Sequence, residues 1–210
     1  MPLSYKSKSE QDYIAFLWDA FRTNYEHEKY QFAFLSYHML TMCCVYFNIW
    51  QIKLMMPDAF RNAMIGFDRD TERELLDSTS PFMFWRVKES AVMRFLKLLC
   101  CGDDYVARCA SLVKERNDSA HANGNIFFND AKLMDKKIDE VLGVVEDIEA
   151  HSKPLIERCY LNFLRDSQNP EEREHEDDLD QLREALIYAN YLSQKDVDVC
   201  VRAGISSLTS

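Results

Sequence analysis

The stretch "FAFLSYHMLTMCCVYFNIW", residues 32 to 50, is apolar on nearly every face of the helix that its composition predicts. It approaches the length of a membrane span but contains Ser36, His38, Thr41 and Asn48. Polar side chains of this kind are costly in lipid and ordinary in a protein interior. Because a thin monomeric bundle could not cover such a helix on all sides, we expect it at the centre of a helical domain or in a subunit interface, and not in a membrane.

The rest of the chain is also patterned for helices. It has only five glycines and five prolines, and most of them stand where a helical pattern begins or ends. Runs of alternating apolar and polar residues rich in β-branched side chains are missing. The sequence therefore predicts an all-α protein, a helical bundle with long core helices. The expected helices cover residues 10–27, 29–55, 57–66, 81–100, 103–117, 129–167, 170–191 and 194–203. Since Pro154 lacks an amide hydrogen, a kink or break is expected near Ser152.

Length and composition suit one large core with an appendage. The chain has 210 residues, of which 47% are hydrophobic. We expect a helical domain over residues 1–168 and an acidic helical extension over residues 169–210, packed on that domain or linked to it. The seven cysteines include no Cys-x-x-Cys pair, so they are interpreted as buried thiols in a reducing compartment. With no secretory signal at the N-terminus, a cytoplasmic location is expected. Neither a metal ion nor another cofactor is predicted.

Charge is distributed unevenly along the chain. A net charge of −10 argues against a surface that coats nucleic acid indiscriminately, so any such contact must be local. Residues 86–116 nevertheless carry seven basic and four acidic side chains, which could guide a phosphate backbone or simply be exposed helix faces. Residues 171–180 contain seven carboxylates. This acidic segment is interpreted as a solvated helix start, with a partner-binding or a shielding role as alternatives.

The segment "RNDSAH", residues 116 to 121, holds the most reactive combination of side chains. Tyr105, Cys109 and Leu112 form an apolar stripe, and the next helical position on that stripe is Arg116, which therefore needs an anionic partner. A histidine takes or gives a proton near neutral pH, and an arginine holds a phosphate or a developing oxyanion with paired N–H donors. Arg116 and His121 together are a minimal set for phosphodiester transesterification without a metal.

This segment resembles the signature of HEPN domains, in which an arginine is followed by a polar residue and, a few positions later, by a histidine. The resemblance implies an all-α domain that dimerises, so that two Arg/His pairs face each other across a cleft and cleave RNA without metal. His121 would activate or reprotonate the ribose oxygens, Arg116 would steady the scissile phosphate, and Asn117 would orient one of the other two. The cleavage would leave a 2′,3′-cyclic phosphate. RNA-binding side chains are expected at Lys114, Arg108 and Lys97.

In HEPN toxins that a nucleotidyltransferase neutralises, a tyrosine stands two residues after the histidine. Here that position is Asn123, which argues against this form of control.

Two functions follow from these observations. The first is a homodimeric HEPN-type endoribonuclease that acts on RNA as a toxin or antiviral-defence effector, with a protein inhibitor or regulatory partner as a further possibility. The second is a noncatalytic, all-helical interaction or scaffold protein. In that case Arg116 pairs with a nearby carboxylate and the acidic segment docks a basic partner.

Overall fold

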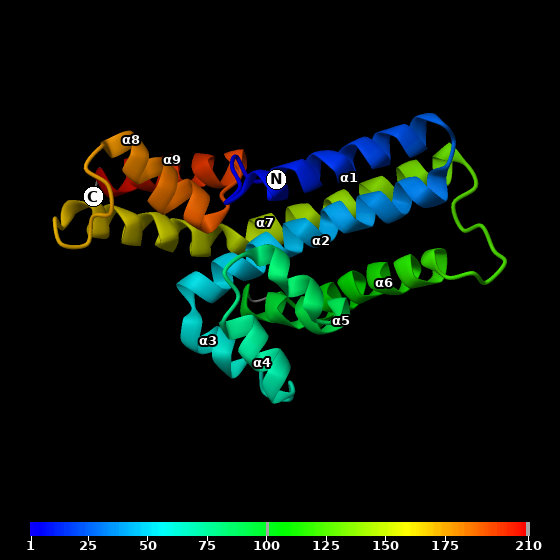
Figure 1. Cartoon of the computed structure of the whole chain (residues 1–210), viewed down its shortest axis with the longest axis horizontal. Coiled ribbons are helices and arrows are strands. Elements are labelled where there is room, and N and C mark those ends of the chain that lie inside the picture. Colours follow the sequence, from blue (N-terminus) through cyan, green and yellow to red (C-terminus); the bar gives the residue numbers. More distant parts are fainter. Residues whose placement is uncertain (100, 209–210) are drawn as a thin grey trace.

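The described part of the chain is all-α, with 77% of its residues in helices. The structure is a computed structural model that describes residues 1–99 and 101–208 and, within these, the side chains of all but residues 103 and 204–208. Figure 1 shows the helices in chain order. They are α1 (Lys8–Glu26), α2 (Tyr30–Met55), α3 (Pro57–Asn62), α4 (Arg69–Leu76), the 3-10 helix η1 (Pro81–Arg86), α5 (Glu89–Val92), the 3-10 helix η2 (Met93–Leu99), α6 (Asp103–Ala120), α7 (Ala131–Gln168), α8 (Asp178–Asp180), the π-helix η3 (Gln181–Tyr188) and α9 (Gln194–Leu208).

Helix α2 is the core of the fold, which confirms the prediction of a central helix. Fifteen of its residues are buried, and α1, α6, α7 and η1 all pack against it. By length and composition α2 could cross a membrane, but 67% of its most apolar window is buried inside the fold. Five of the six described cysteines are buried as well, as the sequence predicted.

The segment predicted as one helix over residues 81–100 is instead three short helices, and its last residue, Cys100, lies outside the described residues. The break falls at Val87, whose backbone is extended with φ −98° and ψ 143°. Phe84 before the break and Phe95 after it are both buried, so each of the separate helices contributes an aromatic ring to the core. Helix α4 was not predicted, although Asp68 caps it by accepting a hydrogen bond from the Thr71 amide.

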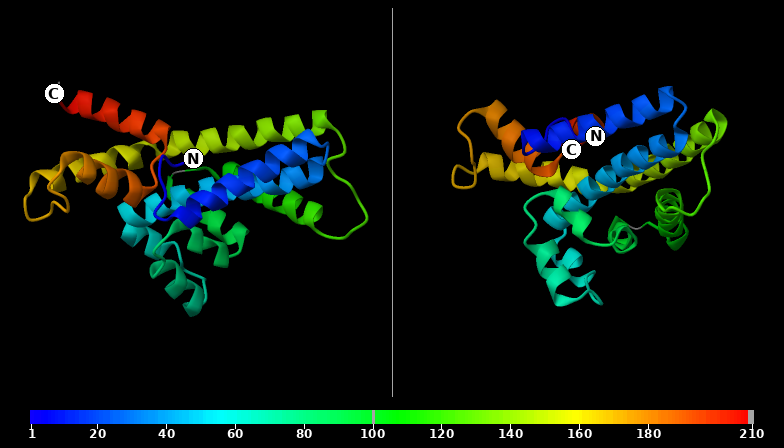
Figure 2. Two further views of the ribbon diagram at one scale, coloured as in Figure 1. Left: turned by 45° about the horizontal axis from the view of Figure 1, so that its top comes forward. Right: turned by 45° about the vertical axis from the view of Figure 1, so that its right-hand side comes forward.

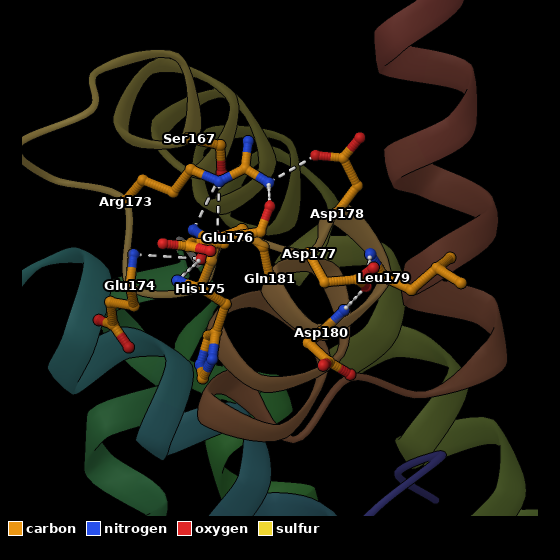
Figure 3. A network of polar contacts seen from close by, with 10 residues as sticks. All are labelled: Ser167, Arg173, Glu174, His175, Glu176, Asp177, Asp178, Leu179, Asp180 and Gln181. Atoms are coloured by element: carbon orange, nitrogen blue, oxygen red, sulfur yellow. Dashed lines mark hydrogen bonds and ion pairs between the residues drawn. The ribbon is translucent and has the colours of Figure 1, made fainter.

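The prediction of a helix beginning at residue 170 is wrong for its first turns. Figure 3 shows that the acidic segment, residues 171–180, folds around two side chains. The Arg173 guanidinium donates to the carbonyl oxygens of His175 and Glu176, at 2.6 and 2.7 Å. The Gln181 amide oxygen accepts from the backbone N–H groups of Glu174 and His175, at 3.2 and 2.8 Å. These side chains bind the backbone groups that a helix would pair internally, so helical structure starts only at α8.

The C-terminal extension packs against the first part of the chain; its residues 209–210 lie outside the described part. The Trp50 indole of α2 donates to the Ala189 carbonyl at 2.8 Å, and the amide of Leu3 donates to the Leu192 carbonyl at 2.8 Å. Helix α7 packs against both η3 and α9, and the segment of α8 and η3 lies beside the C-terminal half of α7 (Figure 1, Figure 2). The extension is therefore held by both the core helix and the N-terminus.

Helix α7 continues through Pro154 without the expected break. Just before the proline, the Ser152 hydroxyl donates to the Ile148 and Glu149 carbonyl oxygens, at 3.0 and 3.1 Å. With 38 residues, α7 is about 57 Å long. The loop of residues 121–130 leads into one end, and the acidic segment follows the other (Figure 1). His121 and the acidic segment of the same chain therefore lie at opposite ends of α7, an arrangement that does not favour the shielding role considered above.

Candidate functional site

Arg116 lies in a three-residue ion cluster between α6, α5 and α2. Its Nη2 atom is 2.5 Å from Oε1 of Glu89, and the other oxygen of that carboxylate is 3.0 Å from Nε2 of His38. The exposed fractions of the side chains are 30% for Arg116, 20% for Glu89 and 2% for His38. Glu89 is thus the anionic partner that the position of Arg116 on the apolar stripe required. Tyr105, Cys109 and Leu112 of that stripe are all buried.

The carboxylate of Glu89 is held in its charged form. Burial alone would raise its pKa, but the hydrogen bonds and charges of His38 and Arg116 outweigh burial and hold the pKa below its ordinary value. Arg116 therefore faces a negative charge throughout the neutral pH range. With 30% of its side chain exposed, Arg116 remains partly accessible to solvent.

His121 lies just beyond the end of α6. The helix runs three residues further than predicted, to Ala120, and His121 caps it with an extended backbone (φ −88°, ψ 147°). The His121 amide donates to the Asn117 carbonyl at 3.2 Å, and its side chain is exposed. His121 therefore does not follow helical geometry from Arg116. Asn117 is half-buried on the last turn but one.

The 121–130 loop is fastened at both ends by one side chain. Nε2 of Gln31, in the first turn of α2, donates to the Ser119 carbonyl at 2.9 Å, and Oε1 of Gln31 accepts from the Phe127 amide at 2.8 Å. Next to this clamp, the Phe128 ring packs on Phe34 with 4.3 Å between ring centroids. Since the backbone on both sides of His121 is bonded to α2, the exposed imidazole sits on an anchored support.

The three predicted RNA-binding side chains are exposed, but the structure does not bring them together with Arg116 as one cluster. Lys114 is on α6, two residues before Arg116, while Lys97 belongs to η2. Arg108 is bonded to Asp147 of α7 at 2.9 Å, and its guanidinium lies over the Tyr105 ring. Arg108 is therefore engaged in holding α6 against α7.

Glu89, His38 and Gln31 were not singled out from the sequence as site residues. One signal was present for His38, because a histidine inside an almost wholly apolar helix must find a polar partner. Nothing local marked Glu89, which lies 27 residues before Arg116 in the chain, where the sequence predicted one continuous helix. Comparisons with protein-family models, with curated proteins and with solved structures give no match.

Proposed function

We propose that this chain is a metal-independent endoribonuclease of HEPN type that acts at the cleft of a homodimer. One observation carries the proposal. Arg116 and His121 stand on either side of a helix end, the arginine fixed by Glu89 and the histidine exposed on a loop that Gln31 clamps. A fixed cation and an exposed imidazole at the same helix end are the two kinds of group that the transesterification of a phosphodiester uses.

The reaction balances with the side chains named. An imidazole removes the proton from a ribose 2′-hydroxyl, and the 2′-oxygen forms a bond to the adjacent phosphorus. The bond from phosphorus to the 5′-oxygen breaks, and a protonated imidazole supplies the proton that this leaving oxygen takes up. The products are a 2′,3′-cyclic phosphate and a 5′-hydroxyl. A second copy supplies the second His121, so that one imidazole acts as base and the other as acid.

In this mechanism Arg116 holds the negative charge that develops on the phosphate oxygens. Glu89 binds one end of the guanidinium, at Nη2, and an arginine has five N–H donors in a fixed fork. The contact with Glu89 thus orients the fork without using all of its donors. Asn117, one position further along α6, would contact the ribose or the phosphate.

The test is RNA cleavage in excess EDTA with purified protein, comparing the wild-type chain with His121→Ala and Arg116→Ala. We expect both variants to lose cleavage. His151→Ala is the matched control, because His151 is also exposed but lies on α7, about 30 Å along the helix axis from its first residue. Detection of 2′,3′-cyclic phosphate ends identifies the chemistry, and a steep dependence of rate on protein concentration supports the dimeric cleft.

One observation favours a second candidate, a noncatalytic helical interaction protein. Glu89 satisfies the charge of Arg116 inside the chain and binds His38 as well, as a purely structural ion cluster would. Absence of cleavage under all conditions, with His121→Ala as stable as the wild-type chain, would favour this candidate over the ribonuclease.

A further inference from the structure

A cavity of about 450 Å³ opens beside the ion cluster. It lies between α1, α2, η1 and α5, and Glu89 is part of its lining. The remaining wall is mainly aromatic rings and methionines, contributed by Tyr13, Met39, Met42, Tyr46, Phe82, Met83 and Trp85. Aromatic and apolar walls with a few polar groups are typical of pockets that bind small planar molecules.

Two tyrosines that line this cavity make no hydrogen bond through their hydroxyls to another described residue. Tyr46 is 7% exposed and Tyr13 is 37% exposed. Among the described residues no buried side-chain polar atom lacks a partner, so the unbonded hydroxyl of Tyr46 is reached by solvent although its ring is buried. Both tyrosines line the cavity, so a ligand that enters it can bond these two hydroxyls in place of water.

Trp85 gives the cavity an open aromatic surface. It is 70% exposed, an unusual fraction for the largest apolar side chain, although its neighbour in the same helix, Phe84, is fully buried. An exposed indole at the edge of a cavity is a platform on which a nucleic-acid base stacks.

The cavity adjoins the cation that the proposed function assigns to phosphate binding. Glu89 lines the cavity and its carboxylate contacts Arg116. A base in the cavity and the phosphate of the same RNA strand at Arg116 would therefore occupy neighbouring sites.

We propose that this cavity binds one unpaired base of single-stranded RNA, stacked on Trp85 and hydrogen-bonded by Tyr13 and Tyr46. The inference rests on the proposed function, because it takes Arg116 as the phosphate site. The substrate would be RNA with an unstacked base, since a base within a duplex cannot enter a cavity. Stacking on one aromatic side chain raises affinity for a strand by about tenfold or more.

The experiment measures binding by the full chain carrying His121→Ala, so that the probe is not consumed. The probe is a fluorescein-labelled RNA octamer of mixed sequence in EDTA, single-stranded or annealed to its complement. We expect the additional change Trp85→Ala to weaken single-strand binding about tenfold. The change Tyr46→Phe keeps the ring and should weaken it severalfold. The duplex should bind more weakly than the single strand.

Trp18→Ala is the matched control. Trp18 is also an exposed tryptophan, at 54%, but it lines a different cavity between α1 and α7. Its removal should leave binding unchanged. Thermal unfolding of each variant separates loss of binding from loss of fold. Because Trp85 is exposed, we expect Trp85→Ala to leave the stability of the fold nearly unchanged.

The outcomes separate this inference from the ribonuclease itself. If His121 is required for cleavage but Trp85→Ala and Tyr46→Phe leave affinity and kcat/KM unchanged, the base pocket is refuted and the nuclease stands. If the single strand binds in a way that depends on Trp85 and Tyr46 but is never cleaved, the pocket stands and the nuclease falls. Failure of the octamer to bind at all refutes the pocket.

Discussion

Replacing Glu89 by Gln tests how firmly the ion cluster holds Arg116. Glu89 binds two cationic or potentially cationic side chains while only 20% exposed, so its charge is poorly solvated. Hydrogen bonds to charged groups contribute about 1.5–3 kcal/mol, and the partial exposure of Arg116 lowers the estimate within that range. We expect Glu89→Gln to cost about 2 kcal/mol of unfolding free energy, which for a chain of this size lowers Tm by about 4–8 °C.

A double-mutant cycle isolates the contact with Arg116 from that with His38. The free energy of unfolding in urea is measured for the wild-type chain, Glu89→Gln, Arg116→Gln and the double variant. The expected coupling energy is about 1–2 kcal/mol. The control cycle uses Arg108 and Asp147, which also join two helices but are 58% and 45% exposed. Their coupling should be about 0.5 kcal/mol or less. A coupling for Glu89 and Arg116 no larger than this control would refute the idea of a fixed guanidinium.

The pH dependence of the same pair has a definite sign. The pKa of Glu89 is lowered in the folded protein from its ordinary value of 4.5. A lowered carboxyl pKa contributes stability that is complete above the unfolded-state value and is lost as pH falls through the folded-state value. The part of the wild-type chain's stability advantage over Glu89→Gln that comes from the Glu89 charge should therefore shrink as the pH falls below about 4.5. Urea titrations at several pH values check this.

Three further predictions concern the supports of the site and the fold. Gln31→Ala removes both hydrogen bonds of the loop clamp, so amide exchange in the 121–130 loop should accelerate at a cost of about 1–2 kcal/mol, as hydrogen–deuterium exchange and urea titration would show. Pro154→Ala restores a backbone donor inside α7 and should raise the unfolding free energy by about 1–3 kcal/mol; an unchanged or lower Tm would contradict this. Arg173→Ala should expose the acidic segment to limited proteolysis, whereas Arg183→Ala, which removes a more exposed arginine, should not.

The long helices were predictable because their signals are local. The apolar faces of α2 and the stripe of α6 repeat at helical spacing over many residues, and this periodicity survives in the fold. The position of Arg116 on the same apolar stripe also predicted that it needs an anionic partner. The identity of that partner could not be predicted in this way, because it depends on how α5 lies against α6, and the break at Val87 in the segment that contains α5 was not predicted.

The acidic segment shows a different limit. Its carboxylates favour the first turn of a helix, and that rule predicted a helix from residue 170. The rule failed because Arg173 and Gln181 bind backbone groups of the same segment, and such capture depends on side-chain positions rather than on composition (Figure 3).

The contact between Glu89 and Arg116 fits both candidate functions, so it does not decide between them. In a scaffold protein, Glu89 neutralises the charge of Arg116 within the fold. In a nuclease, Glu89 orients the Arg116 guanidinium toward the phosphate. The difference lies in His121. A scaffold does not need the exposed imidazole of His121, whereas the proposed transesterification uses it to take and give a proton. Removal of His121 should therefore cost little stability in either case and abolish activity in only one, while removal of Glu89 costs stability in both.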